Sequence, residues 1–528
     1  MNRDFIFSCI IFLIYVSLRS RETIHMLQQN KYNAKMTYVK WLKNNLGKSF
    51  INNSLIFLSL LLFFIYKNDR VLIVFFNIIY LILVIDELTK SGQNKLPLKY
   101  TSRVKRLVFT NVLIHFLIVL GLSFLISKID MIYLYLFLGL IAFLNSAFLL
   151  VSIYVNTPVE KFVGFYYKNK AKNKLKSMSG LSVIGITGSY GKTSCKNILN
   201  DILSIKYNTV PTPKNFNTPF GLMITINNYI DKFADVFIAE MGACQEGDID
   251  ELCKLVHPKY GIITTIGMAH LATFKSQENI QKTKFELVEN LPSDGLAVLN
   301  ADDEWQKSYK LKNDVSIKWI GIENDADVMA KNIKLTHEGT KFDIVFKGDN
   351  NYYKFETRLL GYHNVYNILA AVALGKEMGM SIEQLKAGVS KVKAVEHRLE
   401  LRKNGDITII DDAYNSNPTG SKMALDVLKM MPGKHIVVTP GMVELGEEED
   451  EKNREFGRFM ASSSDEVILV GKKKTKPIYE GLIESGFDKN KIYIINDVMK
   501  AFDLIQKLKY GDTYVLLEND LPDIFNER

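Results

Sequence analysis

The chain has 528 residues, which is too many for one hydrophobic core and predicts three or four folding units. Its formal net charge is +9, but the basic residues gather beside apolar stretches, so we expect contact with anionic lipid headgroups and no nucleic-acid partner. The four cysteines form no CxxC pair, which argues against a disulfide framework or a zinc site.

Apolar stretches dominate the first 155 residues. The last two are long enough for the ~20 residues of a membrane-spanning helix, whereas the first three must borrow flanking polar residues or tilt less. A signal peptide is the alternative for the first stretch, but no small-residue cleavage site follows it. The five stretches are residues 5–18, 55–66, 71–85, 108–126 and 132–155.

The loops between these stretches differ in charge. Residues 19–50 and 86–107 are rich in lysine and arginine, whereas the connectors 67–70 and 127–131 carry far fewer basic residues. Because basic loops stay in the cytoplasm, the pattern predicts a multi-pass region of the cell membrane, with about five spans over residues 1–155 and everything that follows in the cytoplasm. The basic linker at 156–177 suits a solvated helix or contact with phospholipid equally well.

A glycine-rich loop follows the linker. Residues 181–187 form an apolar, β-branched run that leads into Gly-Ser-Tyr-Gly-Lys-Thr-Ser at 188–194 and an amphipathic stretch at 195–205, which is the order strand, loop, helix. Backbone N–H groups of such a loop bind phosphate oxygens, with Lys192 reaching the β- and γ-phosphates and Thr193 holding magnesium. The predicted nucleotide-binding residues here are Gly188, Ser189, Gly191, Lys192, Thr193 and Ser194.

Residues 185–194 resemble the ATP loop of the Mur ligases, which add amino acids to peptidoglycan precursors, and further segments resemble the family in the same order. Ala-Glu-Met-Gly-Ala at 239–243 is similar to the segment whose glutamate binds magnesium. Gly-Met-Ala-His-Leu at 267–271 is similar to the segment whose histidine lies near that metal. The resemblance implies these roles for Glu240 and His270.

Residues 282–287 and 291–303 are similar to MurF-type ligases, which add D-alanyl-D-alanine. The resemblance implies that Lys284 is carbamylated. Reaction with CO2 would turn its ammonium into a carboxylate-like ligand for a second magnesium ion. Taken by itself, Lys284 would be an ordinary surface lysine on a helix.

Three later segments complete the resemblance. Residues 361–371 resemble the helix whose two asparagines reach the nucleotide from one face, residues 396–400 resemble the junction that carries an arginine toward the γ-phosphate, and residues 411–418 resemble the MurF-type loop that closes over ATP. The nucleotide-binding residues that these segments imply are Asn364, Asn367, Arg398, Asp412, Tyr414 and Asn417.

The expected fold is an α-helical transmembrane region followed by α/β domains. The resemblance covers about residues 180–525 and implies a P-loop ATPase-like central domain at 178–400 and a Rossmann-like C-terminal domain at 401–528. After residue 401, strand-like runs alternate with helical stretches, which is typical of a second α/β unit. These runs are residues 408–410, 435–439, 466–470, 491–495 and 514–517.

The resemblance implies an enzyme that joins a carboxylate to an amine. The carboxylate attacks the γ-phosphate of ATP, and the amine displaces the resulting acyl phosphate. ATP and two magnesium ions are the implied cofactors, and charge stabilisation is the main catalytic task. The implied catalytic residues are Lys192, His270, Lys284 and Arg398, and the implied metal ligands are Thr193, Glu240, His270 and Lys284.

The sequence departs from MurF-type ligases before the glycine loop, where those enzymes have a soluble domain that grips a UDP-sugar precursor. We therefore expect a membrane-anchored ligase that joins a cell-envelope precursor, a lipid-linked glycan or peptide, to an amino acid, dipeptide or other amine. One alternative is a ligase of peptidoglycan synthesis that adds D-alanyl-D-alanine to a UDP-linked tripeptide. The others are an inactive membrane-bound scaffold and an ATP-driven transporter. A transporter has no need of the Lys284 and Tyr414 motifs. The scaffold is disfavoured by the joint presence of Lys192, Glu240, His270, Lys284, Arg398 and Asp412.

A second departure lies near the C-terminus. Glu-Asn-Asp-Leu-Pro-Asp at 518–523 stands where the family has a basic run of the Lys-Gly-Ser-Arg type. A basic run suits a carboxylate on the amine donor, whereas an acidic run suits a donor with an extra cationic group; a capping or turn role fits equally. Ala272 also stands where the family commonly has an acidic residue.

Overall fold

The structure is a computed structural model that divides into two compact units, residues 1–166 and 167–528. The residues that it describes are 3–29, 32, 38–44, 69–89, 98–124, 131–268, 271–414, 416–443 and 445–520.

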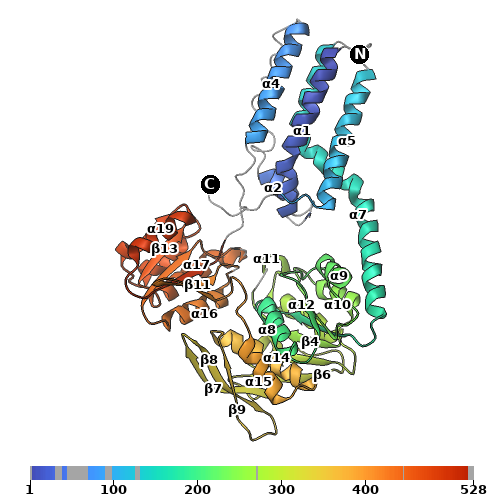
Figure 1. Ribbon diagram of the computed structural model, residues 1–528. Coiled ribbons are helices and arrows are strands. Elements are labelled where there is room, and N and C mark those ends of the chain that lie inside the picture. Colours follow the sequence, from blue (N-terminus) through green and yellow to red (C-terminus); the bar gives the residue numbers. More distant parts are fainter. Residues whose placement is uncertain are drawn as a thin grey trace. The chain divides into compact units, whose positions relative to one another are not determined.

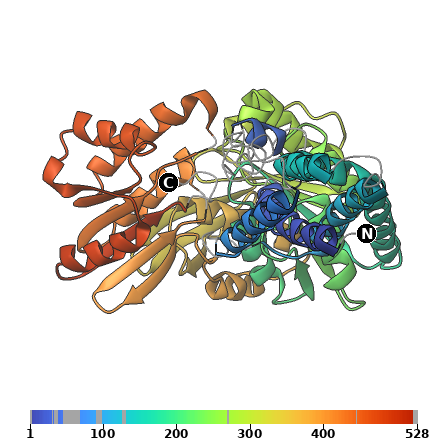
Figure 2. The ribbon, with the colours of Figure 1, turned by 90° about the horizontal axis from the view of Figure 1, so that it is seen from above.

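The first unit is a helical bundle in which α1 lies between α4 and α5 (Figure 1), and Figure 2 views the same helices from above. Within the described residues, two helices, Ser102–Leu122 and Asn145–Lys176, are long and apolar enough to cross a membrane. The apolar stretch at 55–66 lies outside the described residues. The helices are α1 (Arg3–Gln29), α2 (Val39–Asn44), α4 (Asp69–Thr89), α5 (Ser102–Phe124), α6 (Met131–Phe143) and α7 (Asn145–Lys176).

The last apolar stretch of this unit is divided between two helices. A turn at Leu144 separates α6 from α7. Helix α7 then continues through Pro158 to Lys176, so the expected linker at 156–177 is helical over most of its length. Lysine has a high helix propensity, which lets this polar segment extend the apolar helix.

The central sheet of the second unit has the order β2-β3-β1-β4-β5-β6-β7-β8-β9. Strands β2 to β7 run parallel, and β8 and β9 add an antiparallel edge. The strands are β1 (Ser182–Thr187), β2 (Thr209–Pro211), β3 (Val236–Glu240), β4 (Tyr260–Ile263), β5 (Leu296–Asn300), β6 (Ser316–Gly321), β7 (Val328–Thr336), β8 (Gly339–Phe346) and β9 (Tyr353–Thr357).

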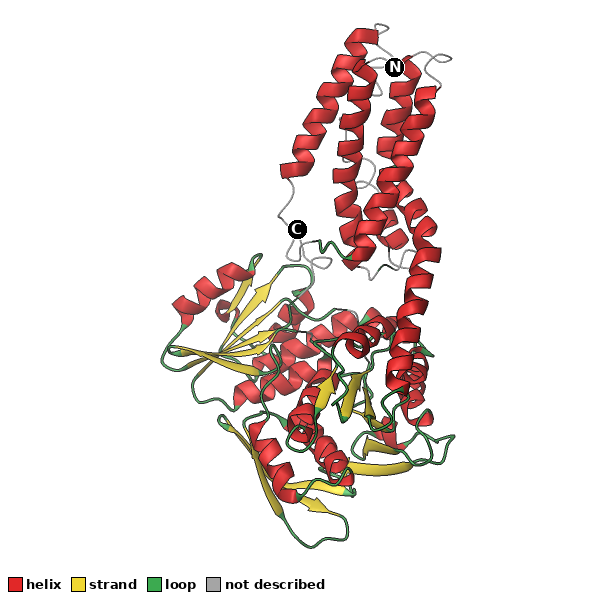
Figure 3. Cartoon of the chain, turned by 45° about the vertical axis from the view of Figure 1, so that its right-hand side comes forward, coloured by secondary structure: helices red, strands yellow, loops and turns green. Residues whose placement is uncertain are grey.

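Helices cover both faces of this sheet (Figure 3). Strand β1 is buried over five of its six residues, as expected for a parallel strand that packs on both faces. One core forms against α8, α14 and α15, and the other against α9, α10 and α12. The helices are α8 (Lys192–Leu203), α9 (Pro219–Asn228), α10 (Asp248–Val256), α11 (Leu271–Phe274), α12 (Gln277–Glu289), α13 (Glu304–Lys307), α14 (Tyr362–Glu377) and α15 (Ile382–Lys391).

The C-terminal sheet has the order β10-β11-β15-β12-β13-β14, parallel except for the edge strand β10. Helices α16, α17 and α18 pack on one face and α19 on the other. The elements are β10 (Glu400–Asn404), β11 (Ile407–Asp412), α16 (Pro418–Lys429), β12 (Lys434–Thr439), α17 (Glu449–Ala461), β13 (Glu466–Val470), α18 (Lys476–Glu484), β14 (Ile492–Ile495), α19 (Val498–Leu508) and β15 (Thr513–Glu518).

These two sheets confirm the expected α/β fold. All five predicted strand-like runs of the C-terminal region fall on β11 to β15. In open parallel sheets, ligands bind beyond the carboxyl ends of the strands, so this edge is where the site residues are to be sought.

Candidate functional site

The glycine loop joins the carboxyl end of β1 to the first turn of α8. Gly191 has a φ of 77° and precedes the helix, and Gly188 has a φ of 148°. A Cβ atom at Gly188 would lie 2.0 Å from the Thr264 hydroxyl, so only glycine fits there. The N–H groups of the first helical turn have no intrahelical acceptors, which makes this end of α8 suitable for phosphate.

Lys192 lies over the loop. Its Nζ donates to the carbonyl oxygens of Gly188 at 2.7 Å and Ser189 at 3.1 Å. Burial, opposed by the charge of Glu240, lowers the pKa of Lys192 to about 8. Ser189 is fixed in turn, because its hydroxyl donates to the Gly267 carbonyl at 2.8 Å.

Glu240 ends β3 and lies beside the loop. Its carboxylate accepts a hydrogen bond from the Thr193 hydroxyl at 3.0 Å, and only 1% of its surface is exposed. The two predicted metal ligands therefore lie together. Magnesium is usually bound by one or two protein ligands plus phosphate oxygens and water, so a hydroxyl and a carboxylate at a phosphate loop fit that ion.

Two side chains that were not predicted from the sequence, those of Lys196 and Asn217, hold the Glu240 carboxylate. Lys196 forms a buried ion pair with Oε2 of Glu240 at 3.1 Å, and the Asn217 side-chain amide donates to Oε1 of Glu240 at 3.1 Å. Lys196 follows Lys192 by one helical turn, and that spacing is the signal that could have revealed it. Together these contacts orient the carboxylate toward Thr193.

Lys284 lies on α12 with only 3% of its surface exposed, so it is not the surface lysine that its sequence context suggests. Its Nζ lies 5.7 Å from the centre of the Phe274 ring. Burial, together with the charge of Lys192, lowers the pKa of Lys284 to about 7. The lowered pKa increases the neutral fraction of this amine, and the neutral amine is the form that reacts with CO2.

The two asparagines of α14 differ in their surroundings. Asn367 lies beside the glycine loop. Its side-chain oxygen is only 3.6 Å from the position that a Cβ atom on Gly191 would take. The Asn364 amide instead donates to the Leu360 carbonyl at 2.8 Å. Both are buried, so α14 presents one polar side chain to the loop and uses the other to hold the segment that precedes the helix.

Arg398 links the loop to the C-terminal domain. Its guanidinium lies 4.5 Å from the centre of the Tyr414 ring, and its charge acts on Lys192 and on Asp412. Burial raises the pKa of Asp412 to about 6 despite the nearby arginine. The Asn417 side chain caps α16 by accepting from the Gly420 amide at 2.9 Å.

His270 lies outside the described residues, as do the side chain of Ala272 and residues 521–523 of the acidic run. Within the described residues, no three histidine, cysteine, aspartate or glutamate side chains gather as a metal site. The candidate magnesium site thus consists here of Thr193 and Glu240.

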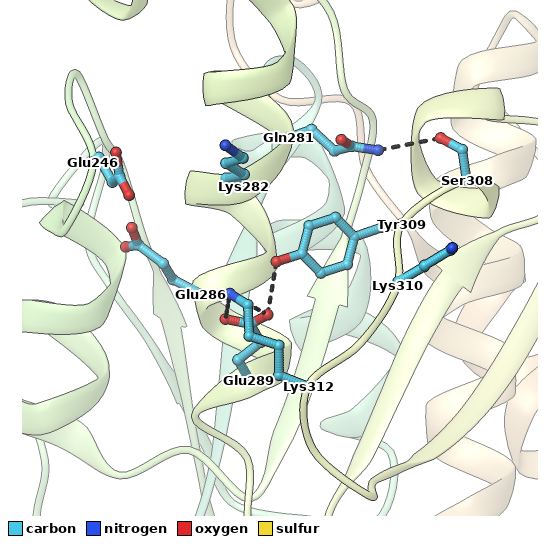
Figure 4. A pocket seen from close by; sticks show the side chains of 9 residues that line it. All are labelled: Glu246, Gln281, Lys282, Glu286, Glu289, Ser308, Tyr309, Lys310 and Lys312. Atoms are coloured by element: carbon cyan, nitrogen blue, oxygen red, sulfur yellow. Dashed lines mark hydrogen bonds and ion pairs between the residues drawn. The ribbon is translucent and has the colours of Figure 1, made fainter.

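The opposite face of α12 borders a cavity of about 310 Å³ (Figure 4). The Tyr309 hydroxyl donates to Glu289 at 2.6 Å, Lys312 pairs with Glu289 at 3.0 Å, and Gln281 donates to Ser308 at 3.2 Å. Many of the polar side chains that line the cavity therefore already have partners within it. We place the chemistry at the glycine loop instead.

Two families match the chain. The Mur ligase middle domain matches residues 186–375, and the family described as Mur ligase, glutamate ligase domain, matches residues 397–517. The first spans the glycine loop, Glu240, Lys284 and α14, and the second spans Arg398 and the C-terminal sheet.

Curated relatives and solved structures agree with these matches. The UDP-N-acetylmuramoyl-tripeptide–D-alanyl-D-alanine ligase of Bacillus subtilis is 32% identical over 62% of this chain and 70% of its own length. The enzyme of that name from Escherichia coli is 33% identical over 55% of this chain and 65% of its own length. A crystal structure of MurF from Acinetobacter baumannii has a TM-score of 0.60 at 27% identity, and the match covers 68% of this chain and 77% of that structure. The crystal structure of MurF from Thermotoga maritima with ADP has a TM-score of 0.61 at 25% identity, and the match covers 68% of this chain and 80% of that structure.

Proposed function

The chain belongs to the Mur ligase family of ATP-dependent amide ligases and is of MurF type. From this premise we propose that it joins the carboxyl group of a UDP-linked muramoyl tripeptide to D-alanyl-D-alanine. These are the substrates named for the relatives. The observation that supports the proposal most strongly is the combination of Lys192, the Thr193–Glu240 pair and buried Lys284 around one phosphate loop. Such a combination suits phosphoryl transfer to a carboxylate.

In this reaction, the positively charged residues of the site stabilise the negative charge of the phosphates and of the transferred phosphoryl group. The loop amides and Lys192 bind the ATP phosphates, and Arg398 adds a second positive charge where the phosphoryl group moves to the substrate carboxylate. Asn367 contacts the nucleotide from α14. Transfer of the γ-phosphoryl group to the carboxylate releases ADP and leaves an acyl phosphate. The neutral amine then attacks the acyl carbon, forms the amide bond and releases phosphate and a proton.

Bound magnesium would act as a Lewis acid that offsets the negative charge of the phosphates. Thr193 and Glu240 would hold it in the proposal, and the family resemblance implies a role at the metal for His270 as well. Lys196 and Asn217 keep the Glu240 carboxylate pointed toward Thr193. A carbamate on Lys284 would provide an anionic ligand for a second magnesium ion.

The proposal predicts acyl phosphate formation without the amine. The full-length protein, given ATP, magnesium, UDP-linked tripeptide and hydroxylamine, should release phosphate and form a hydroxamate, because hydroxylamine traps acyl phosphates. Adding D-alanyl-D-alanine in its place should give the amide, detected by mass spectrometry. Phosphate release that does not depend on the tripeptide, or no hydroxamate with it, would contradict the proposed reaction.

A second candidate differs in location and carboxylate substrate, and the first unit favours it. Phe109 is 69% exposed and Phe116 47%, whereas Arg19 and Glu87 form a buried ion pair at 3.1 Å. Only 28% and 17% of the apolar windows of the two long helices are buried. Apolar side chains outside and polar ones inside suit a bundle in lipid. In this candidate the chain is a multi-pass protein of the cell membrane with cytoplasmic ligase domains, and its carboxylate substrate is a lipid-linked glycan or peptide.

The two candidates predict different results for a chain that lacks residues 1–155. If the substrate is lipid-linked, the shortened chain should lose most turnover on a lipid-linked tripeptide in vesicles, and the full chain should sediment with membranes. Full activity of the shortened chain on the UDP-linked tripeptide, together with no preference of the full chain for the lipid-linked one, would exclude the second candidate.

A further inference from the structure

Arg398 has a left-handed residue on each side. His397 has a φ of 60° and Leu399 has a φ of 46°, which is the region that favours glycine. A residue with a Cβ atom pays free energy for this conformation, so the conformation persists only where surrounding contacts fix it. Backbone strain of this kind gathers at functional sites. Here it flanks the arginine on which the proposed phosphoryl transfer depends.

Leu399 is fixed by the core of the C-terminal domain and by the end of β11. Its side chain is buried in that core, and its backbone N–H donates to Oδ1 of Asp412 at 3.2 Å. The next residue, Glu400, begins β10 and has Asp411 as its register partner. Strand β11 therefore holds the backbone on the C-terminal side of Arg398.

His397 is fixed by its imidazole. Nδ1 donates to Oδ2 of Asp411 at 2.8 Å, and only 5% of the Asp411 side chain is exposed. The carboxylate has partners of its own, because Oδ1 accepts from the Ala413 N–H at 3.2 Å and Oδ2 pairs with Arg402 at 3.3 Å. The imidazole thus ties the residue before Arg398 to a buried carboxylate that is held independently.

The two anchored neighbours direct Arg398 toward the glycine loop. Its backbone N–H donates to the Val395 carbonyl at 3.0 Å, which closes a tight turn. Its charge acts on Lys192 of the loop, on His363 of α14 and on Asp412 of β11. A cation that stabilises a moving phosphoryl group must be placed in advance, because misplacement by about 1 Å can cost ~10²-fold in rate.

We propose that His397, held by Asp411, is a positioning residue that keeps Arg398 directed at the γ-phosphate of ATP. The inference rests on the proposed function, in which Arg398 supplies charge for phosphoryl transfer. The hydrogen bond to Asp411 offsets the cost of the left-handed backbone; without it the turn relaxes and the guanidinium leaves the loop. Both ring nitrogens of His397 face carboxylates, Nε2 lying 3.7 Å from Oε1 of Glu396, so the imidazole acts through Arg398 and does not contact phosphate itself.

The test compares His397→Val with His397→Asn in the full chain. Valine disfavours the left-handed region and cannot bond Asp411, whereas asparagine tolerates that region and its side-chain amide can donate to the carboxylate. His397→Val should lower kcat by about 10- to 100-fold, with KM for the tripeptide unchanged, and His397→Asn should recover most of this loss. Arg402 still pairs with Asp411 in both variants, so the buried carboxylate keeps a cation and the fold is retained.

His257→Val is the matched control for backbone strain. His257 is also left-handed, with a φ of 48°, and it ends α10 near the amino end of β4, at the edge of the sheet away from the glycine loop. This variant should lower the melting temperature as His397→Val does and keep the wild-type kcat.

A double variant decides whether His397 acts through Arg398. Arg398→Ala removes the guanidinium, so adding His397→Val to it should cause no further loss of kcat. A further loss equal to that of His397→Val alone would overturn the inference, because it would show an effect independent of the arginine.

A readout without turnover separates this inference from the proposed function. Calorimetry with magnesium gives the affinities for ADP and for a non-hydrolysable ATP analogue, and their ratio reports the contribution of the γ-phosphate. His397→Val and Arg398→Ala should both reduce this ratio by about 10- to 100-fold, the loss expected for hydrogen bonds to a charged group, whereas His397→Asn and His257→Val should keep it.

The two failures are distinguishable. Absence of hydroxamate in the wild type would contradict the proposed function alone, because the affinity ratio still decides the role of His397. A wild type that binds both nucleotides equally, or a His397→Val variant that keeps the wild-type ratio, would overturn the inference.

Discussion

Replacing Lys192 with methionine is expected to lower ATP-dependent turnover by about 10³-fold, the upper range for removing one charge that stabilises a transition state. The Lys192 ammonium lies at the glycine loop, where it donates to the carbonyl oxygens of Gly188 and Ser189. Methionine keeps most of the side-chain volume and removes the charge. Phosphate release in the presence of both substrates measures the effect.

Lys254→Met is the matched control for this substitution. Lys254 lies on α10, its side chain is 66% exposed, and its ion pair with Asp250 is a surface contact. It should leave turnover unchanged, since exposed pairs contribute little. Measuring nucleotide affinity separately from turnover tells lost binding from lost chemistry. Wild-type turnover by Lys192→Met would remove the loop from the proposed mechanism.

The glycine loop could be predicted from sequence because its geometry is local. Strand, loop and helix are contiguous over residues 182–203, and the two loop glycines have the positive φ values that the motif requires. The roles of Glu240 and Lys284 came from resemblance, since each residue by itself is uninformative. The structure then supplies their physical setting, which is burial beside Thr193 and Lys192.

Contacts between distant residues could not be predicted in the same way. Lys196 and Asn217 lie 44 and 23 residues from Glu240 in sequence, and they meet only because β3 is placed beside β1. Strand β10 was also missed, because the sequence Glu-Leu-Arg-Lys-Asn lacks the apolar pattern of a buried strand. As an edge strand it carries charges that discourage further pairing.

Replacing Lys284 with alanine is expected to lower turnover by about 10²- to 10³-fold, because the proposed carbamate is the anionic ligand of a second magnesium ion. Lys284→Arg should be equally impaired, since a guanidinium remains positively charged and does not react with CO2. Depleting CO2 from the assay should reduce wild-type turnover, and added bicarbonate should restore it. Short carboxylates such as acetate should partly rescue Lys284→Ala by occupying the vacated space.

Lys282→Ala separates this effect from general damage to α12. Lys282 lies on the same helix two residues away, but its side chain points into the surface cavity of Figure 4. It should retain wild-type turnover and show no response to acetate.

We expect that substitution of Lys284 by methionine raises the melting temperature of the protein while it lowers turnover. A buried amine with no ion-pair partner among the described residues is unfavourable in its charged form, as the lowered pKa of Lys284 reflects. Lys284→Met removes that amine while filling the space, so it should raise the melting temperature of the unmodified protein while abolishing CO2-dependent turnover. Unchanged turnover in Lys284→Ala, or a fall in melting temperature of Lys284→Met equal to that of a core truncation, would show that this lysine serves packing and not the carbamate.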